Sequence, residues 1–392
     1  MTIKYRLFAF LFTATIGIVL ISCGGDSGTL VEPTPTPTPT TPTPVEPAVD
    51  LTKVRGDIAN NLANNLIIPA YENLKVETDN LAETVTAFTN APSEATLVAA
   101  QTALKNSWLT WQSAAIYMFG PAEEVALRKS LNTYPTDAIQ IDANIESGDY
   151  ILGSLANQAA VGFPALDYLL NGLAENNEGI IEEYMVMERS NSRKQYLTDL
   201  AVDVQTRVTT SLNGWLPSGE NQVAVFTETD ALGIDVGSSL SIIVNSIDLH
   251  FQRFARDGKV AIPAGIRSAG VPRPKAIEAL YGGYSTELLQ ASLVAYEQLY
   301  MGVGVNDEDK ESLYDYLVAI DAKDLADDIQ AQFEITKTTA NDLTDPFGEQ
   351  IATDVEAVTN VFIEMQKLVV FFKADMASLM GISITNQDND GD

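Results

Sequence analysis

One carboxylate lies inside an apolar run, in the stretch VGFPALDYLLNG at residues 161–172. Gly162 and Pro164 predict a turn, and the leucines after them predict a buried helix. A carboxylate that faces a core is costly unless it is paired or hydrogen-bonded. Asp167 therefore has two interpretations. It stabilises the first helical turn through the free N–H groups and the helix dipole, or it is a site residue that the turn directs into a cleft together with Phe163, which shares its helical face.

Basic residues gather in one segment of an acidic chain, which has 53 acidic and 23 basic residues and a formal net charge of −30. The segment spans residues 253–275, and its only acidic residue is Asp257. The basic residues of the segment are Arg253, Arg256, Lys259, Arg267, Arg273 and Lys275. These charges either neutralise nearby carboxylates and hold a loop in place, or form an anion-binding wall for a carboxylate, a phosphate or a haem propionate. Tyr134 and Asp137, in an earlier loop, are candidates for the opposite wall.

His250 is the only histidine, and it falls on an apolar stripe with Ile243, Ile247 and Phe254. Such a residue is either a core histidine with a satisfied ring nitrogen or a ligand or proton-transfer group. The single cysteine excludes an internal disulfide and a Cys-ligated metal cluster. The negative charge argues against a nucleic-acid partner. It permits a hard cation as cofactor, but composition does not choose iron over calcium or magnesium.

The N-terminus predicts export and a lipid anchor. Lys4 and Arg6 precede an apolar segment at 7–21 that is too short to span a bilayer comfortably, and LISC at 20–23 matches a lipobox. We expect residues 1–22 to be a lipoprotein signal peptide and Cys23 to carry the lipid that attaches the protein to a membrane. The Thr-Pro repeats within residues 23–49 predict a polyproline II tether.

The rest of the chain has helical periodicity almost throughout, which predicts an all-α fold. The clearest stripe is spaced alternately by four and three residues: Ile351, Val355, Val358, Phe362, Met365, Val369, Phe372 and Met376. Further helices are expected at 51–88, kinked or broken at Pro69, and at 93–119, 193–213, 238–256, 276–300 and 308–337. Two stretches, 120–150 and 257–275, lack the pattern and are expected to be ordered loops. Two bundle-like halves are expected at 50–172 and 190–381.

Several stretches resemble the imelysin-like family, and in particular its lipoproteins of Bacteroidetes type. They are GFPALDYLL at 162–170, FGPAEEVALRKSLNTYPTD at 119–137, DGKVAIPAGIRS at 257–268, EALYGGYSTELL at 278–289 and ITNQDNDGD at 384–392. The resemblance covers residues 50–392. It implies two helical-bundle subdomains related by duplication, with a site in the cleft between them. It also implies export to the periplasm or outer membrane, a link to iron regulation or uptake, and a metallopeptidase label.

The family's signature is Gly-x-His-x-x-Glu, and this chain departs from it. Gly162 matches, but Pro164 stands at the His position and Asp167 at the Glu position. Proline has no side-chain donor for a metal, and a catalytic zinc site draws heavily on histidine. The sequence therefore favours a binding protein that assists iron or haem acquisition over an enzyme. The alternatives are an envelope metallopeptidase with a non-standard metal site and a structural or protein-recruiting lipoprotein.

Overall fold

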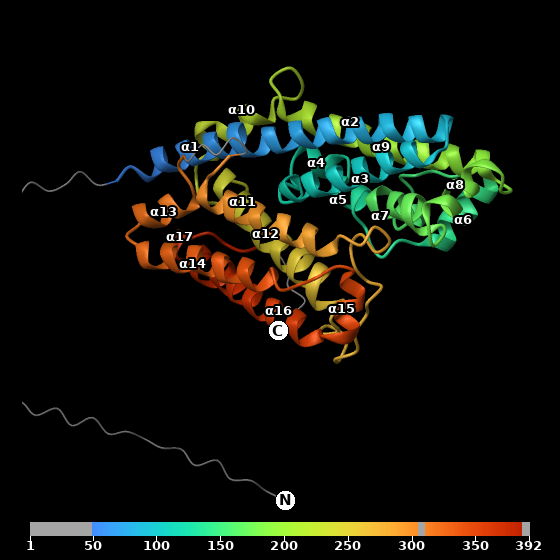
Figure 1. Cartoon of the computed structure of the whole chain (residues 1–392). Coiled ribbons are helices and arrows are strands. Elements are labelled where there is room, and N and C mark those ends of the chain that lie inside the picture. Colours follow the sequence, from blue (N-terminus) through green and yellow to red (C-terminus); the bar gives the residue numbers. More distant parts are fainter. Residues whose placement is uncertain (1–48, 305–309, 386–392) are drawn as a thin grey trace, which may run out of the picture. The chain divides into compact units, whose positions relative to one another are not determined.

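The computed structural model describes residues 49–304 and 310–385, which contain α-helices and turns but no β-strand (Figure 1). The predicted all-α fold is thus confirmed. The predicted signal peptide, Cys23, nearly all of the tether and the acidic tail at 386–392 lie outside these residues. Within them, no helix combines the length and the apolarity that crossing a membrane requires.

One group of helices is built around α2 (Ile68–Asn90), which packs against α3 (Glu94–Ala114) and α9 (Ser190–Trp215). Figure 1 shows α2 and α9 running side by side. Shorter helices pack against α9: α4 (Pro121–Glu124), α5 (Leu127–Leu131), α6 (Ala138–Ser147), α7 (Gly162–Asp167) and α8 (Asn177–Met185). The predicted boundary near 172–192 assigns α9 to the second half, but α9 packs against helices of the first.

A second group contains α12 (Ser285–Met301), α14 (Lys323–Ala340) and α16 (Val355–Val370). Helix α11 (Ser239–His250) continues directly into the π-helical segment η5 (Phe251–Ala261), which packs on α16. Contacts between α3 and α12 join the two groups, and the chain from Val49 onward forms one compact unit. The remaining α-helices are α1 (Leu51–Asn61), α10 (Gln222–Thr227), α13 (Leu313–Ala319), α15 (Phe347–Thr353) and α17 (Ala377–Met380).

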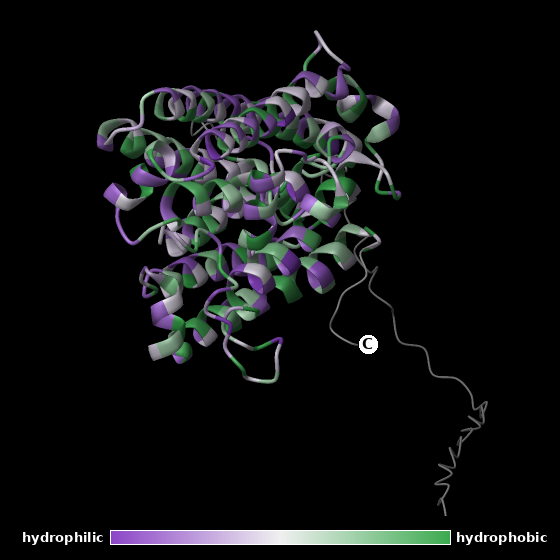
Figure 2. Ribbon diagram, turned by 90° about the vertical axis from the view of Figure 1, so that its right-hand side faces the viewer, coloured by the Kyte–Doolittle hydropathy of each residue, from purple (hydrophilic) through white to green (hydrophobic). Residues whose placement is uncertain are grey.

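The helices are amphipathic, with hydrophobic and hydrophilic residues side by side along them (Figure 2). The predicted stripe at 351–376 is mostly buried, with Val358, Met365 and Met376 fully so. The helix it predicts is interrupted at Asp354, whose backbone leaves the helical region and whose side chain accepts a hydrogen bond from Ala357 N. A capped break within one apolar stripe leaves the stripe intact, so periodicity alone cannot reveal it.

Of the kink or break expected at Pro69, the break does not occur. The helix passes from α1 through a π-helical turn, η1 (Leu62–Ile67), directly into α2, where Pro69 occupies the first turn. A π-helical turn shifts the hydrogen-bond register, and proline has no N–H to donate, so it is tolerated in a first turn, where the backbone donors have no helical partner in any case. The helix expected from 276 instead begins at Ser285, because residues 276–284 form turns that include Gly283 at φ 68°.

Candidate functional site

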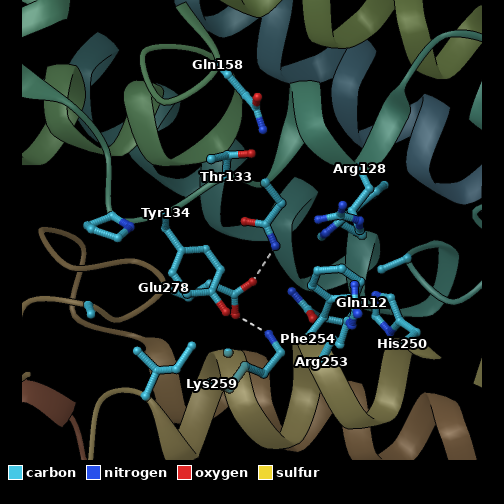
Figure 3. Close-up of a pocket in the computed structure, with 17 residues that line it drawn as sticks. Gln112, Arg128, Thr133, Tyr134, Gln158, His250, Arg253, Phe254, Lys259 and Glu278 are labelled. Carbon is cyan, nitrogen blue, oxygen red and sulfur yellow. Dashed lines mark hydrogen bonds and ion pairs between the residues drawn. The ribbon is translucent and has the colours of Figure 1, made fainter. Parts of the chain in front are cut away.

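A hollow of about 270 Å³ lies where α3, α5 and residues 132–135 face α11, η5 and residues 276–278. We call it the basic hollow. Figure 3 shows its polar side chains, with Glu278, Lys259 and Tyr134 apart from Arg128, Arg253 and His250 in this view. Its wall thus draws on both of the stretches expected to be loops, 120–150 and 257–275. The expectation of a loop is wrong for much of the first stretch, which contains α4, α5 and α6, and for the start of the second, where η5 extends to Ala261. The lining residues are Trp111, Gln112, Ala115, Arg128, Asn132, Thr133, Tyr134, Pro135, Gln158, His250, Arg253, Phe254, Gly258, Lys259, Ile262, Ala276 and Glu278.

A buried polar network forms one side of the hollow. Lys259 and Glu278 make an ion pair, with 5% and 2% of their side chains exposed. Asn132 connects the pair to the core, because its amide donates to Glu278 Oε1 at 2.5 Å and its oxygen accepts from Trp108 Nε1 at 3.1 Å. Burial lowers the pKa of Lys259, and Glu278 acts in the opposite direction. Removing either partner would leave a buried charge without compensation.

Two arginines face the other side of the hollow. The guanidinium of Arg128 lies 3.8 Å from the ring centroid of Phe254, a cation–π contact. Burial lowers the pKa of Arg128, and the charge of Arg253 adds to this effect, while Tyr134 opposes it. Arginine stays charged despite such shifts. Among the residues that the structure describes, three cations therefore line the hollow and Glu278 is its only carboxylate.

His250 lies beside these cations. Its Nδ1 is hydrogen-bonded to the hydroxyl of Tyr296, and its ring lies 5.3 Å from that of Phe254. Burial lowers the pKa of His250 well below 6.5, and the charges of Lys259 and Arg128 contribute. The imidazole is therefore neutral at physiological pH. It is buried with one ring nitrogen hydrogen-bonded, as in the first interpretation from the sequence, and it also lines the hollow.

Of the two candidates from the earlier loop, Tyr134 and Asp137, only Tyr134 lines the hollow. Tyr134 and Gly258 both line the hollow, and they lie close together. A β-carbon added at Gly258 would lie only 3.0 Å from the hydroxyl oxygen of Tyr134. Burial, reinforced by Glu278, raises the pKa of Tyr134 well above 10. Asp137 does not line the hollow; it caps α6 by accepting a hydrogen bond from Gln140 N at 3.0 Å.

The signature positions Gly162, Pro164 and Asp167, and Phe163 beside them, do not line the hollow. Gly162, Phe163, Pro164 and Asp167 are all buried. Asp167 accepts hydrogen bonds from Tyr281 N at 2.9 Å and from the Asn171 amide at 3.0 Å. A void of about 10 Å³ lies beside Pro164 and Asp167, about the smallest space that holds one water molecule. Asp167 therefore anchors the turns at 276–284 that carry Glu278 into the hollow.

Of the predicted arginine wall, only Arg253 lines the hollow. Arg256 and Arg267 both form ion pairs with Asp257, at 2.9 and 3.1 Å, and Arg273 is exposed. Arg256 and Arg267 therefore follow the first interpretation, in which the cluster balances a neighbouring carboxylate. Arg128 is not among the residues predicted from the sequence, although the basic pair Arg128–Lys129 stands out in the acidic stretch 120–150.

A metal site does not fit the residues that the structure describes. Across 49–304 and 310–385, no group of three His, Cys, Asp or Glu side chains is close enough to hold a metal ion. A catalytic zinc normally takes three protein ligands. The wall of the basic hollow is instead suited to a negatively charged group.

Comparison with known proteins places the chain in a family. The sequence model of the imelysin family, which carries the label peptidase M75, matches residues 67–361. The chain therefore belongs to the imelysin family, and the resemblance seen in its sequence is confirmed. No curated protein matches it.

Two solved structures share the fold. The "putative iron-regulated protein A precursor" of Parabacteroides distasonis ATCC 8503 has a TM-score of 0.70 at 16% identity, over 86% of this chain and 96% of that one. An imelysin-like protein of Psychrobacter arcticum 273-4 has a TM-score of 0.66 at 17% identity, over 86% of this chain and 99% of that one. At such identities the similarity establishes the fold alone.

Proposed function

We propose that this imelysin-family protein is a lipid-anchored protein of the cell envelope that binds a small anionic ligand in the basic hollow and assists iron or haem acquisition. The observation that carries the proposal is the charge of the hollow. Arg128, Arg253 and Lys259 line it, against the single carboxylate of Glu278. In a chain of net charge −30, a net positive hollow is a local exception that favours an anion.

Arg128 provides the most direct support. Its guanidinium lies over the face of Phe254, near Tyr134 and the like charge of Arg253, and among the described residues no carboxylate bonds to it. Two guanidinium groups that repel one another are costly to bring together, and an anion between them removes that cost. Guanidinium groups also hold carboxylates through paired, charge-assisted hydrogen bonds.

The link to iron comes from the name of the Parabacteroides distasonis structure and from the sequence resemblance. The described residues offer no ready set of ligands for a bare ion. Iron held by a carboxylate chelator, or in haem, instead presents anionic groups to the protein. We therefore propose that the iron, as cargo, arrives in such a complex and that the arginines bind its carboxylates.

The test is titration calorimetry with citrate and ferric citrate on the mature chain carrying Cys23→Ser. Arg128→Gln should weaken binding at least about tenfold, because a hydrogen bond to a charged group contributes about 1.5–3 kcal/mol. Arg273→Gln, at an exposed site outside the hollow, is the matched control and should bind as the parent does. Equal binding by the two variants would contradict the proposal. No binding of either anion would favour a structural or protein-recruiting role, and chelator-sensitive proteolysis would favour a metallopeptidase.

The anchor is tested separately. Growth with labelled palmitate should label the native protein and leave the Cys23→Ser variant unlabelled. Fractionation should recover the native protein mainly with the outer membrane and release the variant in soluble form. Membrane recovery of the unlabelled variant would contradict the proposed anchor at Cys23.

A further inference from the structure

Two more hollows continue from the basic hollow. The middle hollow, about 430 Å³, shares Arg128, His250, Arg253 and Phe254 with it. The far hollow, about 440 Å³, shares Met118, Glu123, Ser246 and Leu249 with the middle hollow. Because each hollow shares wall residues with the next, the three adjoin in a row. We call this row the groove, and it is much longer than a small anion needs.

One face of α11 and η5 follows this groove. Ile242, Ser246, Leu249 and Arg253 recur at spacings of four, three and four residues, so they share a helical face. At 1.5 Å per residue, Ile242 and Arg253 lie about 16 Å apart along the axis. Ile242 and Leu249 are half-buried, and neither belongs to the apolar side chains that pack against the hydrophobic core. Their apolar surface faces the groove.

The chemistry of the groove changes along its length. Arg128 and Arg253 lie at the junction of the basic and middle hollows, and Lys129 lines the middle hollow. The wall of the far hollow contains no lysine or arginine. Its apolar side chains are Met118, Phe119, Val236, Ile242 and Leu249, and Val236 is 70% exposed. A matching ligand is thus anionic at one end and apolar at the other.

The polar side chains of the far hollow are occupied within the protein. Ser246 donates to the carbonyl of Ile116, and the Asn245 amide donates to Ser383 O at 3.1 Å. The Asn245 oxygen accepts from Thr385 N at 2.7 Å. Glu123 is exposed to solvent. A peptide backbone needs hydrogen-bond partners when it is buried, whereas an alkyl chain needs none.

We propose that the groove binds an amphiphilic carboxylate, with its head at Arg128 and Arg253 and its alkyl chain along α11 into the far hollow. The head group depends on the proposed function; the alkyl chain is the new element. Each methylene group that leaves water adds a roughly constant increment of binding free energy. Affinity therefore rises with chain length until the chain reaches the end of the far hollow.

The test is a chain-length series of butyrate, octanoate and dodecanoate, measured by calorimetry below micelle-forming concentrations on the mature Cys23→Ser chain. Each step adds four methylene groups, and affinity should rise about tenfold or more per step. The double variant Ile242→Ser/Leu249→Ser should lose most of this gain while binding butyrate as the parent does. The matched control is Val202→Ser/Ile363→Ser, because these residues are also half-exposed on helices, at 45% and 46%, and do not line the groove.

The outcomes separate the two proposals. If none of the three carboxylates binds, and citrate does not bind either, the anion site itself is refuted. If butyrate and dodecanoate bind equally, the anion site stands and the alkyl groove is refuted. An extended peptide that binds more tightly than dodecanoate would overturn the amphiphile in favour of a peptide. Chain-length dependence in the parent is decisive even if the groove variant fails to fold.

Discussion

The basic hollow and the surroundings of Asp167 are built from the same parts of the chain, yet only one of them is open. Tyr134 and Pro135 line both, and residues 276–281 reach both. Beside Asp167 the remaining space is about 10 Å³, whereas the hollow measures about 270 Å³. The family's signature positions thus lie in the closed region, and the charged groups that can meet a ligand lie in the open one.

The difference lies in how the polar groups are satisfied. Each oxygen of Asp167 accepts a hydrogen bond from the protein itself, so the carboxylate holds the fold together. Arg128 has the face of Phe254 and a neighbouring like charge, and it has no carboxylate partner among the described residues. A buried carboxylate that the fold satisfies is structural, whereas a cation that the fold leaves with spare hydrogen-bond donors can bind.

The largest effect is expected in the closed region, at Gly162. Its φ is 75°, and a β-carbon there would lie 2.3 Å from the carbonyl oxygen of Leu131. Gly162→Ala should therefore lower the free energy of unfolding by more than about 3 kcal/mol, measured by urea denaturation. Gly148→Ala is the control, because its φ is 64° but no atom lies within 4 Å of the added carbon. Gly148→Ala should lower the free energy of unfolding by only about 1 kcal/mol. Equal costs would show that the close packing at Gly162 is not decisive.

Glu278→Gln should have opposite effects on stability and on binding. It leaves the buried Lys259 charge without its partner, so the free energy of unfolding should fall by about 3 kcal/mol. It also removes the one carboxylate of the hollow, so citrate should bind more tightly. Glu297→Gln breaks a more exposed ion pair, because the side chains of Glu297 and Lys337 are 17% and 22% exposed. This variant should lower the free energy of unfolding by less than Glu278→Gln does. Weaker citrate binding by a folded Glu278→Gln variant would show that Glu278 contacts the ligand favourably.

Asp167 should make stability depend on pH. Burial raises the pKa of Asp167 from 3.8 to about 6. The folded state therefore holds this proton more tightly than the unfolded state does. As a result, the contribution of Asp167 to the free energy of unfolding falls as pH rises from 3.8 to about 6, by an amount on the order of 3 kcal/mol.

Denaturation at a series of pH values checks this prediction. Asp167→Asn should remove the decline. Asp137→Asn, at an exposed helix cap, should retain it. If the stability of the parent rises across this interval and Asp167→Asn abolishes that rise, the carboxylate is stabilised rather than strained by its burial.

The smallest change in stability is expected at Arg128. Arg128→Gln removes a cation–π contact worth about 0.5–1 kcal/mol, and it also relieves the repulsion from Arg253. Thermal denaturation should therefore show a change within about 1 kcal/mol. Arg207→Gln should cost more, because that side chain bonds to Asp203 and to the carbonyl of Val125, both at 2.8 Å. A larger loss at Arg128 would make it a structural residue.

The helical fold could be predicted from periodicity because burial of one face repeats along each helix. The stripe at 351–376 is buried as expected, and Gly381 ends the last helix with φ 68°. Periodicity could not reveal the break at Asp354 or the π-helical turn before Pro69, because each leaves the apolar face in register. It also could not show that α9 packs on α2, since the choice of neighbour depends on contacts across the whole chain.

The site was less predictable than the fold. Clustering in sequence identified Arg253, but it also selected Arg256 and Arg267, which both pair with Asp257. It overlooked Arg128, because the partners that matter come from elements more than 100 residues away along the chain. Whether a charge is neutralised locally or faces a hollow depends on side-chain placement, which spacing does not encode.

The most direct measurement is a crystal structure of the mature Cys23→Ser chain with citrate bound. We predict density for citrate in the basic hollow, with its carboxylates bonded to the guanidinium groups of Arg128 and Arg253 and with Asp167 still bonded to Tyr281 N. Citrate ordered elsewhere while this hollow stays empty, or citrate that displaces the bonds of Asp167, would contradict the assignment of the ligand site to the basic hollow.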